Sequence, residues 1–278
     1  MFLICLAWFN SILSTTLISV FALTYSSWWD YLWILPIALG CTIASHLFNF
    51  VLFAIFGAPV RVKGDFIDKP SKFYHWATEE CLTFLKYFIG FSIKTEGLEK
   101  VPSNGRFVLL VNHKSNFDGL ICSIVLRNRQ ISFISKKEIF DIPIVKGYVY
   151  KMGYLKLDRD DVRQNVKVIR KAQEYLVKDY ACIGVCPEGT RNKTDEPLLP
   201  FKPGATKVAF LGKVPVVIVT MKGAETIGKN FPFKKSKVFF RVVETINYED
   251  YKDMTTVELT QYAEEKMREN VIDMRKLK

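Results

Sequence analysis

The hydrophobic pattern divides the chain into an apolar N-terminal region and a mixed region. Residues 1–29 and 31–60 form two apolar runs, separated by Asp30, the single charged side chain of this region. Each run exceeds the roughly 20 residues that a helix needs to cross the hydrocarbon core of a bilayer. We therefore predict an N-terminal membrane hairpin over residues 1–60. Its turn would lie at 26–30, where two tryptophans suit the interface between water and lipid.

The hairpin prediction has two alternatives. A secretory signal peptide is disfavoured, because no Lys or Arg precedes the first run and a second, longer apolar run follows at once. A half-inserted, monotopic hairpin stays open beside two full crossings, because Pro36 and Gly40 permit a bend and hydropathy reports length rather than path. Arg61, Lys63 and Lys69 follow the second run closely. The positive-inside rule then predicts a cell-membrane protein whose large domain lies on the cytoplasmic side.

After residue 60, short apolar runs of β type alternate with amphipathic segments. The clearest amphipathic segment spans 160–178, with apolar residues on one stripe, acids at its start and a lysine at its end, as the helix dipole favours. Residues 71–91 also show near-helical spacing, and this helix could pack on the core or lie at the membrane interface. The alternation predicts one α/β domain over residues 61–278, with a largely parallel sheet flanked by helices. The predicted strands are 107–111, 131–135, 153–157, 181–186, 214–220 and 238–243.

The charge of the second region indicates a lipid surface as partner. Residues 61–278 hold all 39 Lys and Arg but only 27 of the 28 Asp and Glu. A basic domain tied to an apolar hairpin is expected on anionic lipid, where each nearby basic residue contributes ~1 kcal/mol. No zinc-finger, RNP or basic-helix pattern is present, so we expect no nucleic acid partner. The six cysteines form no C-x-x-C pair and the three histidines form no ligand cluster, which predicts reduced thiols and no metal site.

The segment 112–118 carries the first candidate for chemistry. His113 and Asp118 flank a short stretch directly after the predicted strand 107–111. Residues five apart lie about 140° apart around a helix, so the two side chains meet only if a turn precedes a helix that opens at Asp118. The carboxylate would then hold one imidazole nitrogen and leave the other as a general base. A surface histidine is the simpler alternative for this pattern alone.

No protein nucleophile accompanies this base. The chain contains no G-x-S-x-G elbow, and no cysteine adjoins the 112–118 segment. The attacking group would therefore be the hydroxyl of the substrate itself, and the reaction a direct transfer to an alcohol.

The segment Pro187–Arg191 is the second candidate and follows the predicted strand 181–186. Gly189 permits close approach of the backbone to a ligand, and Arg191 offers a planar fork that suits a phosphate. A polar loop with a surface arginine is the alternative. Ligands of parallel sheets bind beyond the carboxyl ends of the strands, where both segments begin. Together they predict chemistry on a phosphorylated alcohol.

Four segments in order resemble the motifs of the glycerolipid acyltransferase superfamily. They are Asn-His-x-x-x-x-Asp at 112–118, Leu-Lys-Leu-Asp-Arg at 155–159, Pro-Glu-Gly-Thr-Arg at 187–191 and Val-Pro-Val-Val-Ile-Val at 214–219. The Phe-Lys-Pro-Gly-Ala segment at 201–205 is most similar to the PlsC-type 1-acyl-sn-glycerol-3-phosphate acyltransferases. The resemblance covers residues 61–245, and four motifs in order are far more specific than any one of them.

The resemblance implies an enzyme of phospholipid biosynthesis that works without a cofactor. It would transfer an acyl group from acyl-CoA or acyl-carrier protein to the sn-2 hydroxyl of lysophosphatidic acid, giving phosphatidic acid. His113 would deprotonate that hydroxyl and Asp118 would orient His113. The implied substrate-binding residues are Arg159 and Arg191 for the phosphate, Glu188, Gly189 and Thr190 for the glycerol pocket, and Lys136 or its neighbour Lys137 for anionic groups.

One departure and two alternatives accompany this interpretation. Cys186 stands where the family usually has an aromatic residue, which bears on selectivity for the acceptor or the acyl chain more than on the reaction. Acylation of glycerol-3-phosphate or of another lysophospholipid by the same site is the nearest alternative. A membrane-anchored lipid-binding protein is the non-enzymatic alternative. The presence of both His113 and Asp118 argues against it, because binding alone needs no oriented base.

Overall fold

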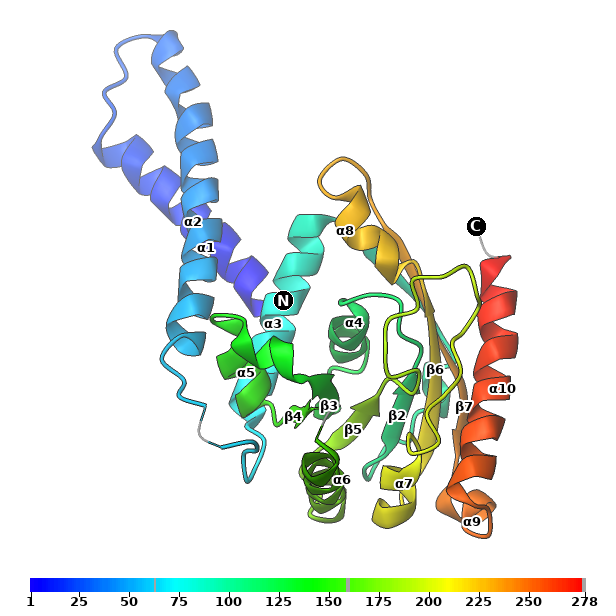
Figure 1. Cartoon of the computed structure of the whole chain (residues 1–278). Helices are drawn as coiled ribbons and strands as arrows, with labels where there is room; N and C mark the ends of the chain where they lie inside the picture. Colours follow the sequence, from blue (N-terminus) through cyan, green and yellow to red (C-terminus); the bar gives the residue numbers. More distant parts are fainter. Residues whose placement is uncertain (63, 159–160, 277–278) are drawn as a thin grey trace.

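A seven-stranded sheet forms the body of the protein, and a helical hairpin projects from one side of it (Figure 1). The computed structural model describes residues 1–62, 64–158 and 161–276. Apolar runs that are buried on both faces form the central strands, as expected for a sheet covered by helices on both sides. All four residues of β2 (Val108–Val111) and of β5 (Cys182–Val185) are buried.

Five neighbouring strands of the sheet run parallel. They are β6 (Val216–Lys222), β2, β5, β3 (Ile131–Lys136) and β4 (Leu155–Leu157), in this spatial order. Beyond β6 lies β7 (Lys237–Ile246), which is antiparallel to it, and then β1 (Ser92–Glu96), which is parallel to β7. The predicted largely parallel α/β fold is therefore confirmed. The prediction missed β1, because its Ser-Ile-Lys-Thr-Glu sequence is polar and its side chains are largely exposed.

Helices cover both faces of the sheet and enclose two hydrophobic cores. One core lies under α6 (Val162–Val177), α7 (Lys207–Gly212) and α10 (Thr256–Arg275). The other lies under α4 (Asp118–Val125) and α5 (Val145–Lys151), next to α3 (Lys72–Ile89). The remaining described helical turns are α8 (Ile227–Asn230), α9 (Tyr248–Tyr251) and the 3-10 turns Trp28–Trp33, Leu98–Lys100, Lys137–Asp141 and Ala224–Thr226.

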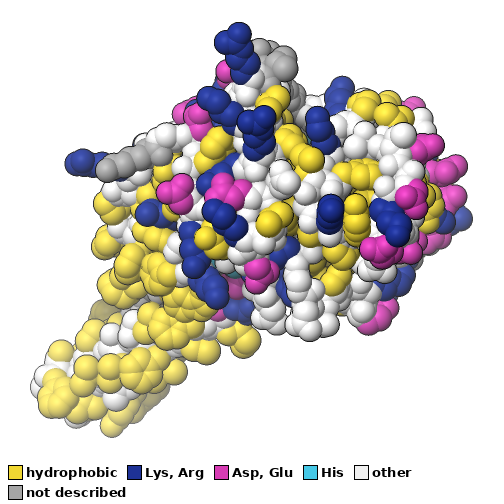
Figure 2. All heavy atoms as spheres, turned by 90° about the horizontal axis from the view of Figure 1, so that it is seen from below, with side chains coloured by type: hydrophobic (Ala, Val, Ile, Leu, Met, Phe, Trp, Pro, Cys, Tyr) yellow, Lys and Arg dark blue, Asp and Glu magenta, His cyan; other side chains and the backbone are white. Residues whose placement is uncertain are grey.

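The N-terminal hairpin consists of α1 (Phe2–Phe21) and α2 (Ile34–Gly57). The Asp30 carboxylate closes the turn between them by accepting the backbone N–H groups of Ser26 and Ser27 at 2.8 and 2.7 Å. Within the described residues these two helices are long and apolar enough to cross a membrane. Figure 2 shows that hydrophobic side chains cover the projecting hairpin, whereas Lys, Arg, Asp and Glu intermingle on the body. Length and composition thus fit a membrane-associated hairpin.

Helix α3 joins the hairpin to the sheet domain. Its Phe84 is fully buried, and the ring contacts the rings of His46 and Phe50 from α2. Phe73 and Trp76 are exposed on the same side, where their rings contact those of Phe56 in α2 and Phe2 in α1. The aromatic side of α3 therefore packs against the hairpin, and its contact with a membrane interface stays a prediction.

Candidate active site

Three neighbouring strands place the candidate residues at the carboxyl ends of the parallel strands, here called the carboxyl edge of the sheet. β2 ends at Val111, β5 at Val185 and β3 at Lys136, and the spatial order β2-β5-β3 makes these ends adjacent. The segments 112–118 and 186–191 leave this edge side by side. The predicted convergence of the two motifs is therefore a direct result of the strand order.

A hydrogen-bonded pair of His113 and Asp118 lies at this edge. The turn that their spacing requires is present, because α4 begins at Asp118 and the intervening residues are not helical. His113 Nδ1 lies 2.9 Å from Asp118 Oδ2. The same oxygen accepts the backbone N–H groups of Lys114 and Ser115, each at 2.8 Å. Three N–H groups on one oxygen favour an ionised carboxylate.

This arrangement leaves the second imidazole nitrogen toward the site. With the hydrogen on Nδ1 given to Asp118, Nε2 of His113 carries the lone pair, and it forms no hydrogen bond within the described part of the chain. The His113 side chain is 22% exposed, whereas that of Asp118 is 1% exposed. The site thus presents a reachable base that is held from behind by a buried carboxylate.

Burial and hydrogen bonding shift the pKa of the Asp118 carboxyl in opposite directions. Removal from water raises the pKa of the Asp118 carboxyl, while the bonds from His113, Ser115 and Lys114 lower it, and the net direction is upward. Asp118 therefore takes up a proton at a higher pH than an exposed aspartate does. Protonation would remove the charge that holds the His113 ring.

Glu188 links the backbone of His113 to that of Leu199. Its Oε1 accepts the N–H of His113 at 2.6 Å and its Oε2 accepts the N–H of Leu199 at 2.9 Å. The side chain is 2% exposed, and burial raises its pKa against these two bonds. The N–H of Asn192 also donates to the carbonyl of His113 at 2.7 Å. Because both of its oxygens are engaged with the backbone, Glu188 shapes a substrate pocket only indirectly.

The rest of the 187–191 segment is a tight turn that ends in exposed side chains. Gly189 has a positive φ of 68°, and its N–H donates to the carbonyl of Cys186 at 3.0 Å. A Cβ at this position would lie 3.3 Å from Cγ of Lys202, so glycine suits both the conformation and the space. Thr190 is exposed and Arg191 half-buried. The Arg191 guanidinium forms no hydrogen bond or ion pair to a residue that the structure describes.

The remaining predicted residues lie on the β3–β4 side of the edge. Lys136 is exposed at the end of β3, beside β5. Its neighbour Lys137 pairs with Asp158 at 2.9 Å. Arg159, which follows, lies outside the described residues. The structure therefore joins His113, Asp118 and Glu188 by hydrogen bonds, and it shows no such contact among Thr190, Arg191 and Lys136.

Sequence reasoning gave no role to Asn112, which supports the site. This side chain is buried, and it accepts the backbone N–H of Met221 at 2.7 Å and donates to the Met221 carbonyl at 3.0 Å. It thereby fastens the end of β2 to β6, directly before the base. A buried amide at a strand end requires such partners, so an asparagine that follows an apolar run is the available signal.

The surroundings of Cys186 disfavour a role as nucleophile. Burial and the nearby carboxylates of Asp118 and Glu188 raise the pKa of its thiol well above the usual range. The thiolate, which is the nucleophilic form, is therefore disfavoured. This agrees with a reaction in which the substrate hydroxyl attacks directly.

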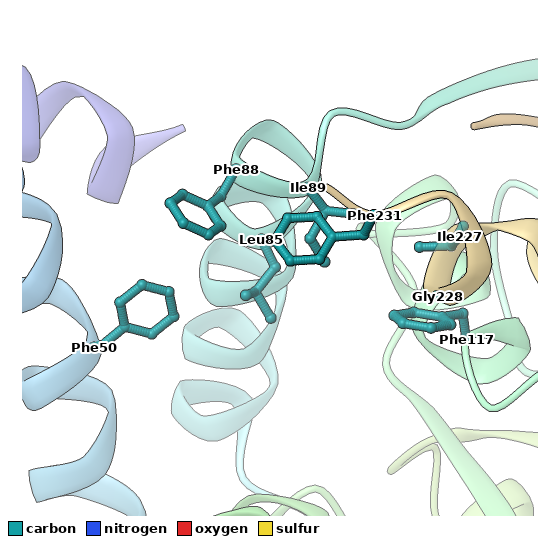
Figure 3. A pocket seen from close by; sticks show the side chains of 8 residues that line it. All are labelled: Phe50, Leu85, Phe88, Ile89, Phe117, Ile227, Gly228 and Phe231. Carbon is teal, nitrogen blue, oxygen red and sulfur yellow. The ribbon is translucent and has the colours of Figure 1, made fainter. Parts of the chain in front are cut away.

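An apolar groove includes one residue of the 112–118 segment in its lining. Phe117, which precedes Asp118, lines it together with Leu85 and Phe88 of α3, and Phe50 of α2 and Phe231 lie along its length (Figure 3). The groove has a volume of about 270 Å³ and connects the edge of the sheet domain with the hairpin. Its lining suits a hydrocarbon chain better than a polar ligand. No group of three or more His, Cys, Asp or Glu is placed to hold a metal ion in the described ranges.

Comparison with known proteins finds similar sequences for the sheet domain. Residues 92–222 match the acyltransferase family model, a range that begins at β1 and ends with β6. The chain is 27% identical to the 1-acyl-sn-glycerol-3-phosphate acyltransferase of Saccharomyces cerevisiae, over 71% of this chain and 65% of that protein. It is 37% identical to the chloroplastic 1-acyl-sn-glycerol-3-phosphate acyltransferase BAT2 of Brassica napus, over 56% of this chain and 44% of that protein. It thus spans less than two thirds of either relative.

The fold agrees with this match. The crystal structure of the 1-acyl-sn-glycerophosphate acyltransferase PlsC from Thermotoga maritima superposes with a TM-score of 0.59 and 26% sequence identity, over 74% of this chain and 79% of that one. The predicted resemblance to PlsC-type acyltransferases, drawn from the four motifs and the segment 201–205, is therefore confirmed.

Proposed function

We propose that this chain, whose residues 92–222 match the acyltransferase family model, moves an acyl group from a thioester to the sn-2 hydroxyl of lysophosphatidic acid, giving phosphatidic acid. The His113–Asp118 pair at 2.9 Å carries the proposal, because it supplies an oriented base at the carboxyl edge of a parallel sheet. The yeast and Brassica napus relatives are 1-acyl-sn-glycerol-3-phosphate acyltransferases, which supports the choice of acceptor.

The proposed reaction needs one proton carrier. His113 Nε2 takes the hydroxyl proton as the acceptor oxygen attacks the thioester carbonyl, and Asp118 stabilises the imidazolium that forms. The tetrahedral intermediate then collapses, the carbon–sulfur bond breaks, and the leaving thiolate takes the proton back from His113. An ester and a thiol result, and His113 is again neutral. No covalent acyl-enzyme is required.

The remaining residues would bind the substrates. Arg191, with Arg159, would hold the phosphate of the acceptor, and Lys136 would add positive charge at the neighbouring strand end. Gly189 and Thr190 would let the glycerol approach the turn, which Glu188 braces. The groove beside Phe117 suits an acyl chain. Acyl-CoA or acyl-carrier protein would be the donor, and no cofactor would take part.

The hairpin would hold the domain on a membrane, where the acceptor resides. The basic residues that follow α2, among them Arg61 and Lys72, support a position on the cytoplasmic side of the cell membrane. Anionic lipid would attract the basic domain to this surface. The proposed boundary between the hairpin and the α/β domain lies at residue 60, shortly after the end of α2.

Turnover by the full-length protein in vesicles tests the proposal. The acceptor panel should contain lysophosphatidic acid, glycerol-3-phosphate and lysophosphatidylcholine, each with acyl-CoA and with acyl-carrier protein as donor. We expect release of free thiol with lysophosphatidic acid and little with lysophosphatidylcholine, which lacks a phosphate monoester. Preferential use of glycerol-3-phosphate would assign the sister activity to the site. Lipid binding without thiol release in any pairing would instead favour the non-enzymatic lipid-binding protein.

A further inference from the structure

A loop on the side of the groove opposite the hairpin exposes aromatic and basic side chains together. It connects α8 to β7 and comprises residues 229–237, here named the Phe233 loop. Phe233 is 93% exposed, the largest exposure among the exposed large apolar side chains that the structure describes. A fully exposed phenylalanine on a folded domain gains no stabilisation from burial unless a second phase such as lipid covers it.

The loop is held in shape, so the exposure of Phe233 is a feature of the fold. The N–H of Lys234 donates to the carbonyl of Asn230 at 2.8 Å, and the Asn230 amide donates to Ser236 Oγ at 3.0 Å. Ser236 is buried, and its carbonyl accepts the N–H of Ser92 at the start of β1. Hydrogen bonds thus hold both ends of the loop, and Phe233 lies between them.

The charge of the loop has one sign. Its basic residues are Lys229, Lys234, Lys235 and Lys237, and no acidic residue occurs between Glu225 and Glu244. All four lysines are exposed, and none forms an ion pair with a carboxylate of the described chain. The lower face of the body differs, because acidic and basic side chains alternate there (Figure 2). An exposed aromatic ring among lysines that form no ion pair suits a lipid bilayer, whose interior is apolar and whose headgroups can be anionic.

The loop also continues the apolar surface of the hairpin. The Phe231 ring lies 6.3 Å from Phe88 of α3, and Phe88 lies 6.1 Å from Phe50 of α2. A chain of aromatic contacts therefore connects the loop to the hairpin across the apolar groove. Figure 1 shows the loop beside α8, at the end of the molecule where α3 ends and past which the hairpin extends.

From these observations we infer that the Phe233 loop is a second membrane contact: Phe233 enters the interface of the bilayer, and the lysines lie against anionic lipid headgroups. The hairpin then anchors one side of the groove and the loop the other. The groove that leads to Phe117 opens onto the lipid between the two contacts. The inference rests on the membrane association in the proposed function and needs no acyl transfer.

The depth of a label at position 233 tests the contact. The full chain carrying Phe233→Cys, with Cys5→Ser and Cys41→Ser to remove the cysteines of the hairpin, takes a nitroxide and is reconstituted in vesicles of phosphatidylcholine with or without phosphatidylglycerol. The same background without Phe233→Cys gives the baseline, and Asp253→Cys beyond α9 is the matched control position. We expect the label at 233 to be exposed to oxygen and shielded from a water-soluble nickel chelate, and the label at 253 to show the reverse. A label at 233 that stays as accessible to the chelate as the label at 253 would overturn the inference.

Charge variants test the role of the lysines. Lys234→Gln with Lys235→Gln should lower the ratio of inserted to free loop in phosphatidylglycerol vesicles by about fivefold for each lysine, and have little effect in phosphatidylcholine alone. The matched control is Lys207→Gln with Lys213→Gln at the two ends of α7, which should change nothing. Shielding of position 233 that requires added acyl-carrier protein would assign the loop to a protein partner and overturn the lipid contact. Thiol release in detergent, measured on the same variants, reports failure of the proposed activity separately from failure of the contact.

Discussion

The two halves of the candidate site differ in how firmly the protein holds them. On the side of the base, Asp118 and Glu188 are almost completely buried and accept five N–H groups between them, three on Asp118 and two on Glu188. On the anion side, Thr190 and Lys136 are exposed, and Arg191 forms no hydrogen bond or ion pair with the residues that the structure describes. Hydrogen bonds fix the base in the free protein, whereas none fixes the cationic side chain of Arg191 within the described residues.

This difference assigns the two halves to different steps. A preorganised base lowers the barrier of the chemical step, because its geometry costs nothing at the moment of reaction. A flexible arginine contributes mainly when the ligand arrives, and its ordering is part of the binding free energy. Changes on the side of the base should therefore lower kcat, and changes on the anion side should raise the KM of the acceptor.

Replacing the base should have the largest effect. In His113→Ala the hydroxyl loses its proton acceptor, so kcat should fall by about 10²- to 10⁴-fold while the fold is retained. Thiol release by the purified protein, with circular dichroism as the check on folding, measures this. His46→Ala in α2 is the control, because it removes a histidine remote from the sheet edge. Near-normal turnover in His113→Ala would refute the mechanism.

Asp118→Asn should give the next largest fall in kcat, because it removes the negative charge beside His113 but keeps most of the geometry. The N–H groups of Lys114 and Ser115 point at one oxygen, so they should keep the amide oxygen of the variant at that place. A neutral oxygen still accepts from His113 but stabilises the imidazolium poorly, and we expect kcat to fall roughly a hundredfold. A loss of acceptor binding with unchanged kcat would contradict this assignment.

The pH dependence should separate activity from stability. Burial raises the pKa of Asp118, so acid neutralises it, and kcat should fall, at a higher pH than an exposed aspartate would give. For stability the sign is opposite. A raised folded-state pKa contributes stability that is fully present below the unfolded pKa and is lost as pH rises through the folded pKa. Acid should thus lower turnover while protonation of Asp118 favours the folded state, which pH–rate profiles beside thermal unfolding curves would show. Coincident loss of both would argue against it.

Glu188→Gln should give a smaller loss, because Glu188 acts through the backbone. A glutamine has one oxygen for two N–H donors, so either His113 or Leu199 would face an NH₂ group. We expect a loss of about 1–3 kcal/mol in the free energy of unfolding and about tenfold in kcat. The exposed Glu196→Gln is the matched control. A variant as stable and active as the parent would show that the brace is dispensable.

The sequence predicted those parts of the fold and site that rest on side-chain pattern. Strand β2 and the first four residues of β6 are continuous apolar runs because both of their faces are covered, and such runs are visible without a structure. The spacing of His113 and Asp118 likewise allowed their pairing to be predicted. Strand β1 escaped notice because a polar edge strand has no apolar pattern.

The supporting contacts were less accessible to sequence reasoning. Asn112 and Glu188 bind backbone groups of Met221, His113 and Leu199, and every residue except proline offers a backbone N–H. The identities of these partners depend on the strand order β6-β2-β5, which local pattern does not specify. The groove of Figure 3 likewise unites residues of α2, α3, the 112–118 segment and α8 that are far apart in the chain.

The smallest effect, and the sharpest test of the anion side, is expected for Arg191→Lys. The substitution keeps the positive charge and removes the planar fork, so one of two charge-assisted hydrogen bonds to the phosphate is lost. At roughly 1.5 kcal/mol for such a bond, the KM for lysophosphatidic acid should rise about tenfold, with kcat and the KM of the donor little changed. Lys193→Ala, an exposed neighbour, controls for the general positive potential of the loop.

The opposite pattern would be equally informative. If Arg191→Lys shifts saturation by acyl-CoA and leaves that by lysophosphatidic acid unchanged, Arg191 binds the phosphates of the donor. If it lowers kcat as strongly as Asp118→Asn does, the two halves of the site are not separate, and the guanidinium contacts the reacting groups in the transition state. Only a rise confined to the KM of the acceptor agrees with a base that is built in advance and an arginine that is ordered by its anion.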